Sequence, residues 1–184
     1  MWVADMDFPA APEILAALDD VTRHGIFGYL DSGKELKDLY ISWLLDRQGI
    51  RIETPWLLPA SGVLAALALS IQELTSPGDA IIYQPPVYYP FGPTIEMNGR
   101  RAVENPLQEV NGQYSFDFAN LRKAASEGAK ALLLCNPHNP VGRVWRRDEL
   151  EELTAVCGEF GLLILSDDIH SDITMPGNTH TPVF

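Results

Sequence analysis

The pattern of apolar and polar residues along the chain predicts alternating helices and strands. In some stretches apolar residues recur at helical spacing, and in others they form short, more continuous runs. The helical pattern covers residues 12–24, 34–48, 63–74, 89–98, 116–126 and 147–160. The short apolar runs, which predict strands, are residues 56–60, 80–83, 101–107, 130–135 and 162–167.

This order of elements predicts an α/β fold. Strands rich in Leu, Ile and Val, each followed by a helix, are typical of a mostly parallel sheet that is covered on both faces. We therefore expect a three-layer α/β/α architecture. In such sheets a ligand binds beyond the carboxyl ends of the strands, so the polar residues directly after those ends are the candidates for a site.

Composition and charge narrow the choice of partners. At 184 residues, with 46% apolar and 21% charged residues, the chain is long enough for one sizeable domain. Its net charge of −12 argues against nucleic acid and anionic membranes as partners. No stretch reaches the roughly 18 apolar residues of a membrane span. The start, MWVADMDF, lacks the features of a signal peptide, so we expect a cytoplasmic protein.

The cysteine count favours a reducing compartment. Cys135 and Cys157 are too few for a disulfide framework, and both lie in apolar patterns. We expect two buried free thiols and no metal site.

The turn after residues 56–60 suits a phosphate group. Ser61 and Gly62 open the apolar helix that begins with Val63 and Leu64. Glycine lets a ligand approach the backbone, and the first turn of a helix offers free N–H groups and partial positive charge. A capping serine before a core helix is the alternative, and this stretch alone does not decide between them.

Two adjacent tyrosines follow the strand 80–83. In the stretch QPPVYYPF, residues 84–91, Tyr88 and Tyr89 are flanked by prolines. One of them would present a flat ring for stacking on an aromatic ligand. Packing of both rings within the protein is the alternative.

The strand 130–135 ends in a rigid polar turn, CNPHNPVG. Each proline fixes its own φ and pushes the preceding residue toward extended geometry, so Asn136 and Asn139 hold their side-chain amides in set directions. We expect Asn139 to donate a hydrogen bond to a ligand oxygen. We expect His138 to be a polar turn residue rather than a ligand contact. An ordinary strand-to-helix loop is the alternative.

The strand 162–167 ends in a carboxylate, Asp167, which Asp168 and His170 follow. A carboxylate at the end of a buried strand is costly without a cationic or hydrogen-bonding partner, and the protonated ring nitrogen of a cofactor would serve. The alternative is that Asp167 caps the next segment and His170 is a polar loop residue. Because such signals recur at several strand ends, one shared ligand site is favoured.

Together these residues resemble a pyridoxal-5′-phosphate (PLP) enzyme of the aspartate aminotransferase fold. More narrowly, the chain resembles the cystathionine β-lyase-like C–S lyases of the class I/II aminotransferase family. The stretches that carry this resemblance are VADMDF (3–8), HGIFGY (24–29), QPPVYYPF (84–91), LLLCNPHNPVGRVW (132–145) and SDDIHSD (166–172). Aminotransferases of the wider family more often have tyrosine where His170 stands, so the histidine favours the lyase branch.

The resemblance implies contacts to the cofactor phosphate and to a partner subunit. Backbone N–H groups of Gly62, Val63 and Leu64 would bind the phosphate, with Ser61 at the turn. Tyr29 matches a tyrosine that reaches the cofactor phosphate of the other subunit, which implies a homodimer. Residues 1–50 would form an N-terminal helical segment in contact with the partner, and residues 51–184 an incomplete PLP-binding large domain.

The resemblance also implies contacts to the cofactor ring. Tyr88 would stack on the pyridine, and Asn139 and His170 would lie near its phenolic oxygen. Asp167 would pair with the protonated ring nitrogen, which keeps the ring an electron sink. The family usually reads SDEIH where this chain reads SDDIH. We expect that change to be harmless, because Asp168 is not the partner of the ring nitrogen.

The implied reaction is β-elimination from cystathionine or another S-substituted cysteine, which releases a thiol, pyruvate and ammonia. It requires a lysine that holds the cofactor as an imine and moves the α-proton. The family places that lysine some tens of residues after the aspartate, whereas every lysine of this chain precedes Asp167. We therefore expect the chain to be the first half of such an enzyme, without its catalytic lysine and inactive alone.

Other functions compete with this one. An aminotransferase on the same fold would use the same aspartate, asparagine and tyrosine. A non-catalytic protein that uses the PLP fold for binding or regulation would lack the lysine. A dinucleotide-binding domain is third, since it needs a G-x-G-x-x-G run that this sequence does not contain.

Overall fold

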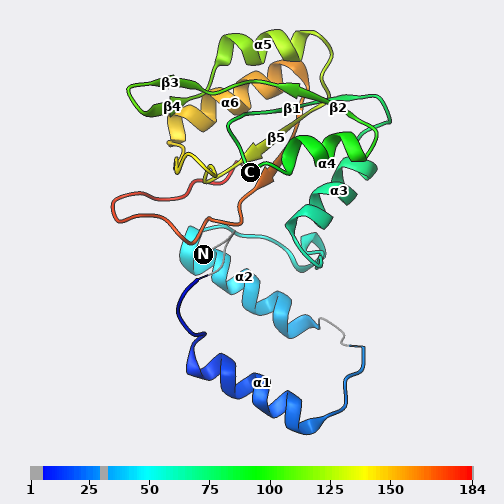
Figure 1. The fold of residues 1–184 in the computed structure, drawn as a ribbon, viewed down its shortest axis with the longest axis vertical. Coiled ribbons are helices and arrows are strands. Elements are labelled where there is room, and N and C mark those ends of the chain that lie inside the picture. Colours follow the sequence, from blue (N-terminus) through cyan, green and yellow to red (C-terminus); the bar gives the residue numbers. More distant parts are fainter. Residues whose placement is uncertain (1–5, 30–32, 184) are drawn as a thin grey trace.

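The computed structural model describes residues 6–29 and 33–183 and shows a sheet between two layers of helices (Figure 1). The four strands of this sheet lie in the order β2-β1-β5-β6, and every neighbouring pair is parallel. Their bounds are Ala80–Tyr83 for β1, Arg101–Glu104 for β2, Ala131–Cys135 for β5 and Leu163–Asp167 for β6. The predicted three-layer α/β/α class is confirmed.

Successive residues of the central strands face opposite layers. In β5, Leu132 and Leu134 join a core cluster on one face, and Leu133 and Cys135 join a separate cluster on the other. The first cluster packs under α5 (Phe118–Ser126) and α6 (Arg147–Phe160), and the second under α3 (Val63–Leu74) and α4 (Phe91–Met97). A strand that is buried on both faces explains the unbroken apolar run of β5.

The predicted strand at residues 56–60 is wrong. The structure has a 3₁₀ helix at Thr54–Trp56 (η1), and the chain after it is irregular. Leu57 is extended, with φ −92° and ψ 118°, and the side chain of Leu58 is 87% exposed. A strand exists only as part of a hydrogen-bonded ladder, and no described segment pairs with this one.

An antiparallel hairpin was not predicted. It consists of β3 (Gln108–Val110) and β4 (Gln113–Ser115), joined by Asn111 and Gly112. Both turn residues have positive φ, 53° and 79°, as a two-residue hairpin turn requires. The predicted strand at 101–107 correspondingly ends at Glu104.

The two N-terminal helices pack less closely than the rest. Helix α1 (Pro12–His24) buries none of its residues and lies apart from the sheet (Figure 1). Helix α2 (Lys34–Gln48) contacts the loop after β6, where Trp43 Nε1 donates a hydrogen bond of 2.9 Å to Asp172 Oδ2. The predicted division at residue 50 stays a prediction. No helix within residues 6–29 and 33–183 is long and apolar enough to cross a membrane.

A buried arginine fixes the C-terminal end of α3 to the start of β2. Arg100 is 8% exposed, and its guanidinium donates to Thr75 Oγ1 (2.9 Å), to the Asn98 carbonyl (2.6 Å) and to the carbonyls of Gln72 and Thr75. Helix carbonyls at this end have no intrahelical partner, and the negative end of the helix dipole favours a cation. Arg100 therefore fixes the C-terminal end of α3, and the N-terminal end of the same helix lines a cavity.

Replacing this arginine tests its role. In Arg100→Lys, a single ammonium group cannot reach partners on several sides, so we expect the free energy of unfolding to fall by about 1–3 kcal/mol. Urea denaturation measures the change. The neighbouring exposed Arg101 provides the control, and Arg101→Lys should stay within about 0.5 kcal/mol of the wild type. Equal effects at the two positions would contradict this role.

Candidate functional site

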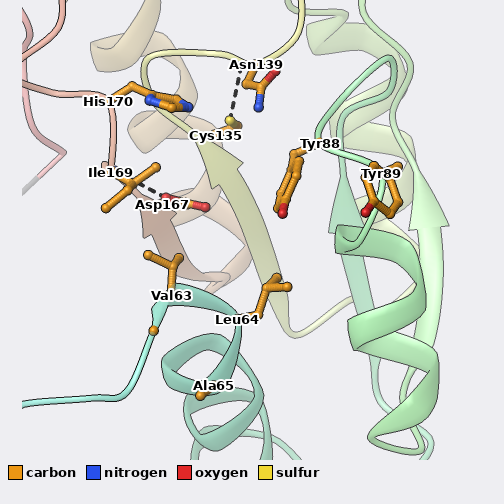
Figure 2. A pocket seen from close by; sticks show the side chains of 11 residues that line it. Val63, Leu64, Ala65, Tyr88, Tyr89, Cys135, Asn139, Asp167, Ile169 and His170 are labelled. Carbon is orange, nitrogen blue, oxygen red and sulfur yellow. Dashed lines mark hydrogen bonds between the residues drawn. The ribbon is translucent and has the colours of Figure 1, made fainter. Parts of the chain in front are cut away.

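A cavity of about 800 Å³ lies where β5 and β6 end and α3 begins (Figure 2). Its volume is in the range of small-molecule sites. The residues that line it are Gly62, Val63, Leu64, Ala65, Tyr88, Tyr89, Cys135, Asn139, Asp167, Ile169 and His170.

Most of the predicted site residues share this cavity, but two do not line it. Ser61 is exposed and directly precedes Gly62, the residue at the N-cap of α3. The side chain of Tyr29 is fully exposed between α1 and α2. The cofactor roles of all the predicted residues, including these two, stay predictions.

The first turn of α3 presents free N–H groups to the cavity. The helix begins at Val63, and no side chain caps it. The first intrahelical bond at this end is donated by Ala66 N to the Gly62 carbonyl. The amides before Ala66 therefore have no helical partner, and together with the helix dipole they suit an anion. The alternative in which Ser61 caps the helix is not what the structure shows.

Asp167 is a buried carboxylate with few partners. It is the last residue of β6, is 6% exposed, and accepts one hydrogen bond of 3.2 Å at Oδ1 from Ile169 N. Burial raises its pKa above the ordinary value, and the Ile169 amide and nearby His170 lower it only in part. No lysine or arginine in the described chain forms an ion pair with it. A cation in the cavity would stabilise the charged form.

Tyr88 and Asn139 point into the same cavity as Asp167 (Figure 2). Tyr88 lies between β1 and α4, and its ring makes edge contacts with Tyr89 (5.4 Å between centroids) and Phe91 (6.2 Å). These contacts fix the plane of the Tyr88 ring and leave one side toward the cavity. A carboxylate, an amide and an aromatic ring from separate elements thus converge on one space.

Cys135 supports the turn that carries Asn139. Its Sγ accepts a hydrogen bond of 3.3 Å from the backbone N of Asn139 and lies 3.4 Å from the carbonyl of Pro137. Burial raises the pKa of the Cys135 thiol to about 12, so it stays protonated and unreactive at neutral pH. The buried thiol was expected from the sequence, but its place in the cavity lining was not. Its place at the end of a strand, as with Asp167, was the available signal.

His138 joins the turn of Asn139 to the turn of Tyr88. Its Nε2 lies 2.9 Å from the carbonyl of Pro86, so Nε2 carries the proton and donates. The residue is 2% exposed and does not line the cavity. It is a turn residue, as expected, but it is a buried one. Burial lowers its pKa below the ordinary 6.5.

The family model for aminotransferases of class I and II matches residues 3–183. The chain belongs to this family. The predicted family is therefore confirmed, and the described part of the fold corresponds to the large domain of PLP-dependent transferases.

C–S lyases are among the relatives of this aminotransferase-family chain. It is 44% identical over 183 residues to "Cystathionine beta-lyase PatB" of Bacillus subtilis (strain 168). This match covers 99% of this chain and 47% of the relative. The crystal structure of cystalysin from Treponema denticola, which contains PLP, has 40% identity and a TM-score of 0.93 over 98% of this chain and 46% of that one. The PLP-bound C–S lyase from Staphylococcus hominis has 33% identity and a TM-score of 0.94, and the match covers 100% of this chain and 47% of that structure's chain. The chain thus spans about half the length of the relatives it matches.

The buried imidazole of His138 predicts a pH-dependent stability. Its folded pKa lies below 6.5, so as the pH falls through 6.5 the unfolded chain takes up the proton first and stability is lost. In His138→Gln the amide nitrogen replaces the Nε2 donor but does not titrate. We expect the stability difference between wild type and variant to be constant above pH 7.5. Below pH 6.5 the free energy of unfolding of the wild type should fall relative to that of the variant by up to about 1.4 kcal/mol per pH unit.

Urea unfolding of both proteins at several pH values between 5 and 8 measures this difference. A difference that does not change with pH would show that the folded protein binds the proton as well as the unfolded chain does.

Proposed function

We propose that the full protein is a PLP-dependent C–S lyase, which cleaves cystathionine or another S-substituted cysteine to a thiol, pyruvate and ammonia. The observation that carries this proposal is the convergence of Asp167, Asn139, Tyr88 and the first turn of α3 on one cavity. The similarity to proteins named as cystathionine β-lyase and C–S lyase supports the choice of reaction.

The residues present fit PLP. The uncapped first turn of α3 suits the phosphate. Among residues 6–29 and 33–183 the buried carboxylate of Asp167 forms no ion pair with a lysine or arginine, and a pyridinium nitrogen would supply the cation. The ring of Tyr88 lines the same cavity and suits stacking on a flat heterocycle (Figure 2). When bound, PLP supplies an electron sink for the charge left on the substrate α-carbon after proton removal.

Asp167 would keep a proton on the ring nitrogen of the cofactor. Its carboxylate is buried, so its attraction to a cation is screened far less than at the surface. The Ile169 amide holds one carboxylate oxygen and fixes its direction. Asp167 thereby maintains the positive charge that draws electrons away from the substrate.

Asn139 and His170 would contact the phenolic oxygen of the cofactor. The backbone of Asn139 is held by Cys135, so its amide is directed into the cavity before any ligand arrives. His170 lines the cavity next to Ile169 and is half-buried. No lysine in the described chain lines the cavity, so we assign the movement of the α-proton to a lysine supplied from outside this lining.

The predicted homodimer belongs to the same proposal. Helix α1 leaves Ile14, Leu15 and Leu18 about half exposed, and uncovered apolar side chains on one helix favour a protein partner. We expect light scattering of the full protein to give the mass of two chains. A monomer at micromolar concentration would contradict this expectation and the role of Tyr29 with it.

A lyase assay tests the reaction. We expect the full-length protein with PLP to release pyruvate from L-cystathionine without any 2-oxo acid acceptor, as measured with lactate dehydrogenase and NADH. Strict dependence on an acceptor would instead identify an aminotransferase. Neither activity, together with no change in visible absorbance on adding PLP, would favour a non-catalytic protein.

Substitution of the carboxylate tests the site. In Asp167→Asn the ring nitrogen would lose its charged partner, and we expect kcat/KM to fall by about 10²–10³-fold. Asp148, an exposed carboxylate in the first turn of α6, provides the control, and Asp148→Asn should retain full activity. A variant of Asp167 as active as this control would overturn the assignment.

A further inference from the structure

Residues 178–183, here called the return segment, come back to the sheet after the long loop that follows β6 (Figure 1). Its hydrogen bonds to the turns after β5 and β6 are made by two consecutive residues, His180 and Thr181. The His180 side chain is 3% exposed and contacts Asp168, and the Thr181 carbonyl accepts a hydrogen bond of 2.9 Å from Asn136 Nδ2. Val183 packs against the core cluster on the α5 and α6 face. The return segment therefore lies against the carboxyl ends of both β5 and β6.

His180 fixes the position of Asp168. Its Nε2 lies 3.1 Å from Asp168 Oδ2, and because a carboxylate only accepts, Nε2 is the donor. The hydroxyl of Ser166 donates to the other carboxylate oxygen, Oδ1. Asp168 is thus held from two sides, and it does not line the cavity that its neighbour Asp167 lines.

Thr181 fixes the other turn of the site. Asn136 is fully buried and directly follows β5, and its backbone N donates a hydrogen bond of 3.0 Å to the Asp167 carbonyl. The same residue starts the turn that places Asn139 in the cavity. One short segment therefore holds, through side chain and backbone, both turns that carry the polar groups of the site.

We propose that His180 and Thr181 are positioning residues, which hold Asp168 and Asn136 so that Asp167 and Asn139 keep their directions toward the bound ligand. Asp168 directly follows Asp167 in the chain, so holding the Asp168 side chain through His180 and Ser166 also fixes the backbone that carries Asp167. This inference rests on the proposed PLP site, but not on the reaction catalysed there.

Substitutions at position 180 separate positioning from simple packing. His180→Leu introduces an apolar side chain of similar bulk and removes the donor to Asp168, whereas His180→Gln keeps a donor near the position of Nε2. In the full-length protein, freed of cofactor and titrated with PLP, we expect His180→Leu to raise the dissociation constant by at least about tenfold. His180→Gln should bind close to the wild-type level.

Asp168→Ala removes the same contact from the other side. It should weaken PLP binding as much as His180→Leu does, and the double variant should be no worse than either single variant. The side chain of Asp168 is 26% exposed, so this variant carries the test if His180→Leu fails to fold. Thr174→Val provides the control, because Thr174 makes a hydrogen bond to Asn178 within the same loop but touches neither turn.

Hydrogen exchange gives a readout that needs no cofactor. The Ile169 amide bonds to Asp167 Oδ1 and the Asn139 amide bonds to Cys135 Sγ, so these two amides report on the two turns. We expect both to exchange faster in His180→Leu than in Thr174→Val. If the protein bound no PLP and formed no pyruvate, the proposed function would fail while this result still decided the positioning role.

A purely structural role of His180 would give a different result in the same measurements. If exchange in His180→Leu accelerates only within residues 174–183, and PLP binding and kcat match the wild type, His180 merely anchors the return segment and the inference is overturned.

Discussion

The parallel pairing of β5 with β6 is the constraint on which the site depends. In this register Cys135 lies opposite Asp167, so both strands end at the same level. The hydrogen bond from Asn136 N to the Asp167 carbonyl extends the ladder one step beyond the strands. A slip of one residue would turn Asp167 toward the opposite face of the sheet and leave the Asn139 turn at a different height. Alternate side chains of β5 pack into two separate core clusters, so such a slip would break the packing on both faces.

Asp167 places a carboxylate at the buried end of β6, where burial disfavours its charged form. Burial raises the pKa of Asp167, and in the described chain only an amide and a nearby histidine act in the other direction. Such a group is best explained by a positively charged ligand, which would offset the cost of burying the charge. The surrounding structure is correspondingly rigid: His138 joins the turns of Tyr88 and Asn139, and Arg100 fixes the far end of α3.

Elements that depend on a local residue pattern were predicted from the sequence, and elements that depend on partners distant in the chain were missed. Helix α6 was predicted with its observed bounds because its apolar spacing is regular and Gly161 ends it in the left-handed region. The strand predicted at 56–60 failed because its apolar residues cannot form a ladder alone. The Asn111–Gly112 turn was a local signal that was overlooked. The rule that ligands bind at strand ends pointed to Asp167 and Asn139, and both line the cavity, while their ligand contacts stay predictions.

The supports of the site were beyond sequence reasoning for a physical reason. Asp167 and Asn139 are recognisable because their polar character contrasts with the apolar strands before them. His180 and Thr181 lie in a segment without periodicity, and they act on the site only because the loop after β6 folds back. Thr181 contributes a backbone carbonyl, which any residue would supply, so its side chain carries no signal. A site of this kind is therefore recognised from its strand ends, but the precision of its geometry is set by contacts that only the folded chain brings together.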